Sequence, residues 1–401
     1  MEHQPYSVPS RTLMGAGPSD VPERVRRALM QPTIGHLDPA FLELMDEVKA
    51  LLQYAFRTSN VMTIPVSGPG TAGMESCVVN LVEPGDKVIV CVNGYFGGRL
   101  KSMAERCGGT VVELALPWGR AVDPERLEQA LREHPDAKIV AFVHAETSTG
   151  ALSDAKTLAE IAHRHGCLTI VDTVTSLGGS PVEVDAWGLD AVYSGSQKCL
   201  AAPPGLSPIT LNERALEKVR SRKKPVQSWF MDVSLLMSYW SGAGRRAYHH
   251  TAPSNAIYGL YEALLMLREE GIENAWERHR VNHLALRAGL EALGLSYVVP
   301  DGERTPQLNA VHIPDGVDDA RVRRRLLDEH NLEISAGLGD FAGKVWRIGL
   351  MGYGSRWENI ERCLTALGSA LIAEGVKVDP HAAVEAAREA LDSALAVSGR
   401  A

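Results

Sequence analysis

Two stretches of this chain are apolar at nearly every position, Ile139–Val143 and Leu168–Val171. Strands that are apolar throughout are buried on both faces, which is typical of parallel sheets covered by helices on two sides. Helical patterns, with apolar residues three or four positions apart, fill the intervals between runs of this kind. The alternation predicts an α/β fold whose mostly parallel sheet lies between helices.

Apolar strand-like runs and helical patterns alternate along most of the chain, and helical patterns dominate beyond residue 250. Asp123 before Pro124 is typical of a helix start, with an N-cap and a proline in the first turn. We expect strands at 61–66, 87–92, 110–114, 138–144, 167–172 and 189–193, and shorter strand-like runs at 296–299, 309–313 and 344–350. We expect helices at 39–56, 70–82, 96–107, from 123 onward, and at 154–165, 255–268, 273–293, 318–330, 357–372 and 381–397.

A chain of 401 residues is long enough for two or three domains. The first 20 residues lack periodicity and are rich in Pro, Ser and Gly, which indicates an extended arm. We expect a large domain at 21–274 and a smaller α+β domain at 275–375. A helical extension at 376–401 completes the chain.

The composition excludes several functional classes. A net charge of −8 argues against a nucleic-acid surface, which needs a basic face. Six cysteines without a C-x-x-C pair predict a reducing, cytoplasmic setting without disulfides or zinc. No apolar run reaches about 18 residues and no signal-peptide pattern opens the chain, so we expect no membrane association. His249 and His250 suggest a metal, but adjacent side chains point apart in an extended chain, so we expect none.

Three loops follow predicted strands and carry chemically useful residues. The loop at 67–72 is rich in glycine and precedes a helix, so it forms either a tight turn or a phosphate cradle. Asp172 ends a buried strand, where a carboxylate serves as a helix N-cap or faces a cationic ring nitrogen. Lys198 is the one basic residue of its loop, and the alternative to a catalytic amine is a surface lysine.

Asp172 and Lys198 are 26 positions apart, which leaves room for one α/β unit between neighbouring strands. The carboxyl ends of parallel strands meet at one edge of a sheet, so the two side chains can lie in one site. An amine that forms imines, a carboxylate for a pyridinium and a phosphate cradle together describe a pyridoxal phosphate site.

Motifs along the chain resemble those of the class V aminotransferases, which are pyridoxal phosphate enzymes of fold type I. The similarity is greatest to alanine–glyoxylate and serine–glyoxylate aminotransferases, and it covers nearly everything from Gly15 to about Ile372. The motifs are Gly-Ala-Gly-Pro at 15–18, Ser-Gly-Pro-Gly-Thr at 67–71, Glu-Pro-Gly-Asp at 83–86, Glu-Thr-Ser-Thr-Gly at 146–150, Val-Asp-Thr-Val-Thr-Ser at 171–176, Ser-Gly-Ser-Gln-Lys at 194–198, Tyr-His-His-Thr at 248–251 and Arg-Ile-Gly at 347–349.

The resemblance implies a large domain with a seven-stranded, mostly parallel sheet and a smaller C-terminal α+β domain. It implies that Lys198 forms the internal aldimine with pyridoxal 5′-phosphate and that Asp172 pairs with the pyridinium nitrogen. Thr147 is expected to bind the ring hydroxyl. Phe96 takes the stacking position where relatives commonly carry Trp, with Tyr95 adjacent to it.

The remaining implied roles concern the phosphate and the substrate. Gly70, Thr71 and Gln197 are expected to contact the phosphate. In the homodimer that the resemblance implies, Tyr248 and Thr251 reach across the interface to the partner's phosphate. The resemblance further implies that Arg347 binds the substrate α-carboxylate, for which the guanidinium fork is well suited.

The predicted activity is a ping-pong transamination from alanine or serine to glyoxylate. Aspartate–glyoxylate, pyridoxamine–pyruvate and aminophosphonate–pyruvate transamination remain alternatives on the same fold. Cysteine desulfuration is disfavoured because the loop at 333–339 contains no cysteine and Cys363 falls in a helical pattern. A cofactor-binding regulator would need a basic DNA-binding domain, and neither terminal segment has the composition of one.

Overall fold

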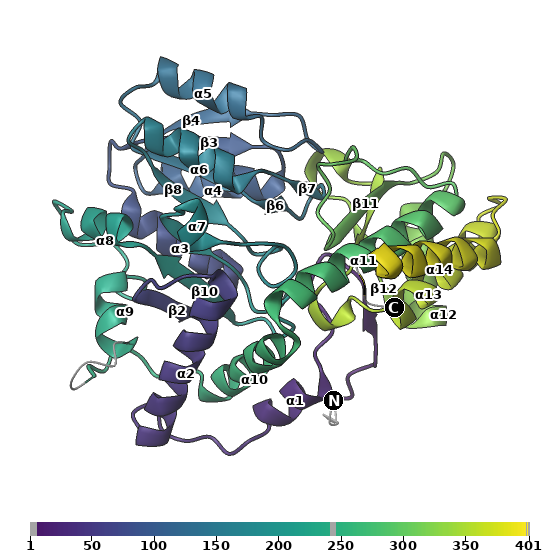
Figure 1. Ribbon diagram of the computed structural model, residues 1–401, viewed down its shortest axis with the longest axis horizontal. Helices are drawn as coiled ribbons and strands as arrows, with labels where there is room; N and C mark the ends of the chain where they lie inside the picture. Colours follow the sequence, from purple (N-terminus) through teal and green to yellow (C-terminus); the bar gives the residue numbers. More distant parts are fainter. Residues whose placement is uncertain (1–5, 241–245, 398, 400–401) are drawn as a thin grey trace, which may run out of the picture.

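The computed structural model describes residues 6–240, 246–397 and 399, and the parts of the predicted arm and extension that fall at 1–5, 398 and 400–401 lie outside them. A seven-stranded sheet forms its centre (Figure 1). The strand order is β2 (Met62–Ser67), β10 (Leu206–Leu211), β9 (Ala191–Tyr193), β8 (Leu168–Asp172), β5 (Ile139–Val143), β3 (Lys87–Val92) and β4 (Thr110–Ala115). All neighbours pair in parallel except those of β10. The predicted mostly parallel, seven-stranded sheet is therefore confirmed.

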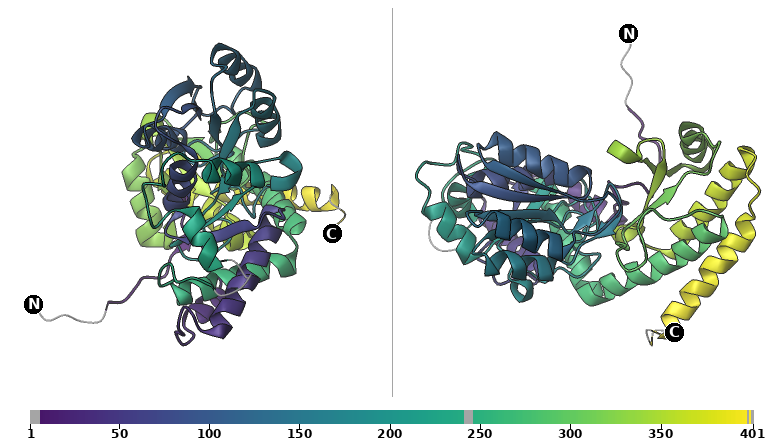
Figure 2. Two further views of the ribbon diagram at one scale, coloured as in Figure 1. Left: turned by 90° about the vertical axis from the view of Figure 1, so that its left-hand side faces the viewer. Right: turned by 90° about the horizontal axis from the view of Figure 1, so that it is seen from above.

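Helices cover both faces of this sheet (Figure 2). Every residue of β5 is buried, as its unbroken apolar sequence requires. Asp123 begins its helix as predicted, because its side chain accepts the N–H of Glu125 at 2.9 Å. The helices of this part are α3 (Gly70–Leu81), α4 (Tyr95–Arg106), α5 (Pro124–Glu133), α6 (Ala155–Arg164), α7 (Val184–Trp187) and α8 (Glu213–Arg220).

The direction of the strands decides where a site can form. β10 runs antiparallel to both β9 and β2, so β2 and β9 run the same way. The carboxyl ends of β2, β3, β5, β8 and β9 consequently meet at one edge of the sheet, and the loops that follow them lie together there. The hairpin β6 (Ala145–Glu146) and β7 (Ala151–Leu152) follows β5 at this edge.

A smaller three-stranded antiparallel sheet lies beside the first, in the order β11 (Leu308–His312), β14 (Val345–Gly349) and β13 (Ser335–Ala336). It packs with α11 (Ile272–Ala292), α12 (Asp319–His330) and α13 (Trp357–Ala373). The short helices η1 (Gly339–Phe341) and η2 (Gly352–Gly354) flank β14. The helix predicted near the C-terminus is α14 (Pro380–Val397), which lies along α11 at the outer edge (Figure 2).

The buried apolar residues form two large clusters. One runs from Val25 to Ala275 and contains the central sheet, and the other combines Met14 with residues between Val281 and Ala394. The long helix α11 connects the two apolar clusters. It runs without a break through the predicted domain boundary between residues 274 and 275. The four-part division of the chain stays a prediction.

Sequence patterns missed several elements and added one. The predicted arm contains a short strand, β1 (Thr12–Leu13), which pairs in parallel with β12 (Leu332–Glu333) in a two-stranded sheet. The strand expected at 296–299 is wrong, because only an isolated bridge from Tyr297 to Val311 forms there. The remaining helices are α1 (Glu23–Leu29), α2 (Pro39–Phe56), α9 (Val233–Trp240) and α10 (Ser254–Glu270), of which α1 and α9, like α7 and α8, were not predicted.

Over the same described ranges, no helix is long and apolar enough to cross a membrane. Nor do three or more His, Cys, Asp or Glu side chains gather in an arrangement that could hold a metal ion anywhere in this part of the chain.

Candidate active site

A cavity of about 220 Å³ opens where the loops at the sheet edge converge. It collects seven of the ten residues singled out in the sequence: Gly70, Thr71, Phe96, Thr147, Asp172, Gln197 and Lys198. Pro69, Met74, Arg99 and Val174 complete the lining. These residues lie at the ends of five strands, β2, β3, β5, β8 and β9, or in the segments that follow them, so the site follows from the parallel sheet itself.

Lys198 is nearly buried, with 8% of its surface exposed. Its Nζ donates a hydrogen bond to the carbonyl of Ala16, in the N-terminal segment that passes over the site. Burial, together with the nearby charge of Arg347, lowers the pKa of this amine to about 8. Near neutral pH, part of the Lys198 amine is therefore neutral and nucleophilic. An exposed lysine on the surface would be almost entirely protonated.

The N-terminal segment fits over Lys198 because residue 17 is glycine. A Cβ at Gly17 would lie 2.4 Å from Nζ, and the φ of +106° is unfavourable for residues with side chains. Ser19 holds the segment in place by donating its backbone N–H to the carbonyl of Gln197 at 2.9 Å. The arm thereby forms one wall of the site.

Asp172 is 3% exposed and both of its carboxylate oxygens accept hydrogen bonds. The N–H of Val174 donates to Oδ1 at 2.8 Å, and the hydroxyl of Tyr193 donates to Oδ2 at 2.9 Å. Residues 174–176 form a turn, so the helix N-cap alternative is wrong. Burial raises the pKa of Asp172 to about 7, which a cationic ring nitrogen would reverse.

The opposite end of the cavity is the start of α3. Pro69 precedes Gly70 and provides no side-chain cap, so the first turn presents N–H groups and the positive end of the helix dipole. The Oε1 atom of Gln197 is buried here and has no hydrogen-bond partner among the described residues. Arg99 donates from Nη1 to the hydroxyl of Thr71 at 3.0 Å. The N–H groups of this helix start and the guanidinium of Arg99 suit an anion, whereas the Oε1 of Gln197 is an acceptor that needs a donor.

Arg99 was missed in the sequence. Its signal was helical spacing, since it lies three residues after Phe96 and so shares a face of α4 with it. Glu146 was also missed as a residue that shapes the site. Its buried carboxylate accepts the N–H groups of Phe96 and Gly97 at 3.2 Å, which places an acid at the N-terminus of α4 and fixes Phe96. Burial raises the pKa of Glu146.

Arg347 lies on β14, the middle strand of the small sheet, and is 7% exposed. Its Nε donates to the carbonyl of Ala336 at 2.8 Å and its Nη1 donates to that of Thr147 at 3.1 Å. Burial lowers its pKa to about 10, so it stays cationic at neutral pH. No carboxylate in the described ranges pairs with it, which leaves its charge for a ligand.

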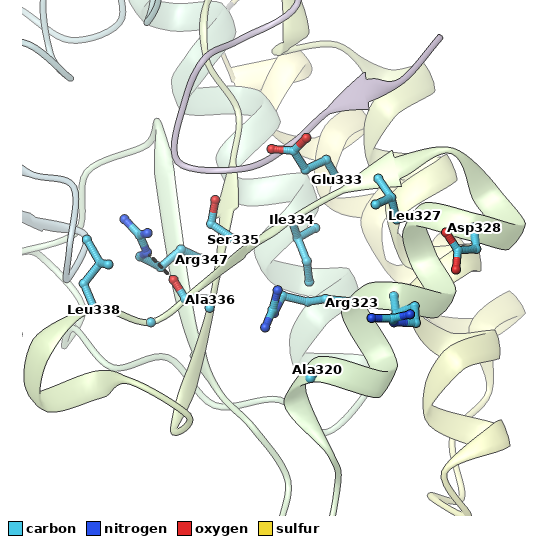
Figure 3. Close-up of a pocket in the computed structure, with 12 residues that line it drawn as sticks. Ala320, Arg323, Leu327, Asp328, Glu333, Ile334, Ser335, Ala336, Leu338 and Arg347 are labelled. Carbon is cyan, nitrogen blue, oxygen red and sulfur yellow. Dashed lines mark hydrogen bonds between the residues drawn. The ribbon is translucent and has the colours of Figure 1, made fainter. Parts of the chain in front are cut away.

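A second cavity, of about 820 Å³, opens beside Arg347 (Figure 3). Ser335, Leu338 and α12 line it together with Arg347. Thr147 borders the first cavity, and its backbone carbonyl accepts from Arg347, so a residue of the first cavity contacts a residue of the second.

Tyr248 and Thr251 do not reach this cavity. Both side chains are exposed, their hydroxyls lie 3.4 Å apart, and the Tyr248 ring packs on His36 with centroids 5.0 Å apart. The contact predicted for them is with the phosphate of a second copy of the chain. The structure of a single chain does not test it, so it stays a prediction.

The expectation that His249 and His250 point apart is wrong. Their Nδ1 atoms lie 2.8 Å apart and share a hydrogen bond. His250 turns inward to bond Ser67 at 2.8 Å, and His249 stacks on Trp229 with ring centroids 4.4 Å apart. Aromatic packing therefore determines the directions of these two side chains, and they do not alternate as in an extended strand.

The fold and the cavity define an α/β transferase of fold type I, built to hold a cofactor between a lysine and a carboxylate. The chain belongs to the class V aminotransferase family, whose sequence model matches residues 13–351.

Three relatives illustrate the similarity. Alanine–glyoxylate aminotransferase of Rattus norvegicus is 41% identical over 370 residues, which are 92% of this chain and 89% of the relative. The solved structure of alanine–glyoxylate aminotransferase from Nostoc sp. is 49% identical with a TM-score of 0.90, over 92% of this chain and 98% of that one. The ureidoglycine–glyoxylate aminotransferase structure from Bacillus subtilis is 38% identical with a TM-score of 0.94, over 97% and 100%.

The cofactor of this family is pyridoxal 5′-phosphate, and the residues of the cavity fit it. Asp172 is a buried carboxylate that lacks a cation, and the uncapped N-terminus of α3, with the guanidinium of Arg99 beside it, lacks an anion. Lys198 is an amine whose pKa is already lowered toward neutrality. Each of the three parts of the cofactor, ring nitrogen, phosphate and aldehyde, thus has a group of matching chemistry.

Proposed function

We propose that this aminotransferase moves the amino group of a small L-amino acid, alanine or serine, to glyoxylate by a ping-pong mechanism. The observation that carries the proposal is the position of Arg347, which donates to the carbonyl of Thr147 in the cavity that holds the buried amine of Lys198 and pairs with no carboxylate of the described residues. Glyoxylate as acceptor is supported by the relatives, since each of the three is named for it.

Pyridoxal phosphate, when bound, supplies a protonated ring that withdraws electrons from the substrate and so weakens its Cα–H bond. Asp172 keeps the proton on the ring nitrogen, because a carboxylate beside it stabilises the cation. Arg347 binds the α-carboxylate and turns the Cα–H bond toward Lys198. The Nζ of Lys198 accepts the α-proton and returns it to the cofactor side, and the carbonyl of Ala16 holds this nitrogen between the two events.

The other predicted roles are part of the proposal. Phe96 stacks on the ring and Thr147 bonds its hydroxyl, while Gly70, Thr71 and Gln197 hold the phosphate. Tyr248 and Thr251 complete the phosphate site of a second copy, so the active form is a homodimer. The exposure of both side chains supports this role, and the cytoplasm is the proposed location.

(S)-Ureidoglycine is a second candidate donor. A Bacillus subtilis transaminase named for it is 38% identical over 404 residues and 96% of this chain. The cavity of about 820 Å³ beside Arg347 also leaves room for a side chain larger than a methyl group. Aspartate is a further candidate, because two arginines of α12 line this cavity: Arg323 is paired with Asp319 at 2.7 and 3.0 Å, and Arg324 is available for a distal carboxylate.

A donor panel tests the proposal. L-alanine, L-serine, L-aspartate and (S)-ureidoglycine are each incubated with the holoenzyme, first with glyoxylate and then with pyruvate as acceptor. Alanine or serine with glyoxylate should give the largest kcat/KM. Turnover with aspartate alone, or with pyruvate in place of glyoxylate, would contradict it. Lys198→Ala should abolish both turnover and the absorbance of the lysine-bound cofactor, and normal turnover by this variant would overturn the mechanism.

A further inference from the structure

The phosphate end of the pocket lacks a positive charge among the residues that were assigned to it. Gly70, Thr71 and Gln197 offer backbone N–H groups, a hydroxyl and an amide, all neutral. A phosphate ester carries between one and two negative charges near neutral pH, and a buried anion without a counter-charge is unfavourable. The cavity is lined by two cations, Lys198 and Arg99. Lys198 is committed to the aldehyde end, so Arg99 is the candidate.

Contacts on three sides hold the guanidinium of Arg99 near the start of α3. Its Nη1 donates to the hydroxyl of Thr71 at 3.0 Å, in the first turn of that helix. Its Cζ lies 4.9 Å from the ring centroid of Phe96 and 5.4 Å from that of Tyr95. A cation–π contact uses the charge of the guanidinium and not its N–H donors, so these donors remain available for hydrogen bonds.

The charge of Arg99 is unmatched within the described ranges, where no carboxylate lies at ion-pair distance from it. Other half-buried arginines of this chain are paired, as Arg278 is with Glu270 at 2.6 Å and Arg323 is with Asp319 at 2.7 Å. A guanidinium has five N–H donors, and one contact to a threonine hydroxyl satisfies few of them. A half-buried arginine of this kind is prepared for an anionic ligand.

We propose that Arg99 binds the phosphate of pyridoxal phosphate, together with the first turn of α3 and Gln197. The inference rests on the proposed placement of the cofactor in this cavity. It makes Arg99 a cofactor-binding residue that no sequence motif pointed to, and it gives Thr71 a second task, which is to orient the guanidinium. Phe96 also acquires two neighbours, the cofactor ring and the cation.

The test compares two ligands that differ only in the phosphate. Cofactor-free full-length protein is titrated with pyridoxal 5′-phosphate and with pyridoxal, and binding is followed by the absorbance of the lysine-bound ligand. Both ligands react with Lys198, so that contribution cancels in the ratio of their dissociation constants. The variants are Arg99→Gln and Arg99→Lys, and the matched control is Arg106→Gln, an exposed arginine of the same helix.

Arg99→Gln should weaken the binding of pyridoxal 5′-phosphate roughly 10- to 100-fold, the loss of one charge-assisted hydrogen-bond site, and leave pyridoxal within about 3-fold. Arg99→Lys should restore part of the loss, and Arg106→Gln should change neither ligand. Inorganic phosphate should compete with pyridoxal 5′-phosphate for the wild-type protein and compete less well for Arg99→Gln.

Two results would overturn the inference. Equal weakening of both ligands would mean that Arg99 supports the structure of the pocket and does not bind phosphate. Unchanged binding of pyridoxal 5′-phosphate would mean that Arg99 is not a ligand at all. Either result leaves the proposed transamination standing if the donor panel succeeds, whereas wild-type protein that fails to bind pyridoxal 5′-phosphate would remove both.

Discussion

The two ends of the cofactor cavity differ in how complete they are. At the ring end, Asp172 is buried, both of its oxygens are hydrogen-bonded, and Tyr193 behind it is fully buried. At the phosphate end, Gln197 has a buried oxygen without a partner, and α3 begins without a side-chain cap. The groups at the ring end are therefore already hydrogen-bonded within the chain, whereas those at the phosphate end still lack partners.

This difference predicts two kinds of variant. Changes at the ring end should alter the chemistry and leave the cofactor bound, because the groups there tune protonation. Changes at the phosphate end should release the cofactor and leave the chemistry of bound molecules intact, because the groups there supply binding that is uniform along the reaction.

The largest expected effect is that of Asp172→Asn. An amide cannot stabilise a protonated ring nitrogen as a carboxylate does, so kcat should fall about 100- to 10,000-fold, as for loss of a group that controls a proton. The dissociation constant of pyridoxal phosphate should change far less. Single-turnover rates and an equilibrium titration measure the two quantities. A variant that lost the cofactor but kept its kcat would contradict the assignment of Asp172 to the chemistry.

The same substitution should change the pH dependence of the stability of the cofactor-free protein. The pKa of Asp172 is raised to about 7, so its contribution to stability is fully present at low pH and is lost as pH rises through 7. At pH 8, Asp172→Asn should therefore be more stable than wild type by roughly 1 to 4 kcal/mol, and at pH 4 the gain should vanish. Urea unfolding at the two pH values measures this, and an equal gain at both would contradict it.

Capture of the cofactor should depend on pH through Lys198, whose pKa is lowered to about 8. Only the neutral amine reacts, so the rate at which cofactor-free protein binds pyridoxal phosphate should rise about tenfold between pH 7 and pH 9. Stopped-flow absorbance measures the rate. A flat profile, or a midpoint near the ordinary lysine value, would show that burial does not tune this amine.

Tyr193→Phe should have a smaller effect at the ring end. The phenol donates to Oδ2 of Asp172, and its removal makes that carboxylate a stronger base. We expect a change in kcat of about 3- to 10-fold, the net value of one ordinary hydrogen bond, with a shifted pH profile and unchanged cofactor affinity. An unchanged pH profile would assign Tyr193 to packing alone.

The smallest effect is expected for Gln197→Ala at the phosphate end. The amide makes no hydrogen bond through Oε1 before the ligand binds, so nothing in the protein is broken by its removal. Affinity for pyridoxal phosphate should fall about 3- to 10-fold, with kcat at saturating cofactor unchanged. A fall in kcat instead would place Gln197 among the groups that act on the chemistry.

Much of this site could be predicted because it follows from the parallel sheet. Asp172 and Lys198 end or follow strands with clear apolar patterns, so strand direction alone brings them to one edge. Arg347 came only from the resemblance, since nothing in its own segment indicates that β14 faces the sheet edge.

The rest depends on packing between distant segments, which periodicity does not encode. The carbonyl of Ala16 lies against Lys198 because β1 pairs with β12, more than 300 residues away in the chain. His249 and His250 turned out to be hydrogen-bonded to each other because rings from other segments surround them. Arg99 belongs to the site through a hydroxyl on another helix.

A half-reaction shows whether the buried amine, carboxylate and arginine of this chain carry out transamination. Holoenzyme is mixed with L-alanine and, in a parallel sample, with L-serine, without any oxo acid acceptor, and the released products are quantified. We expect one equivalent of oxo acid per subunit from the preferred donor and no release of ammonia. Turnover should resume when glyoxylate is added. Continuous release of ammonia, or no oxo acid from either donor, would contradict this expectation.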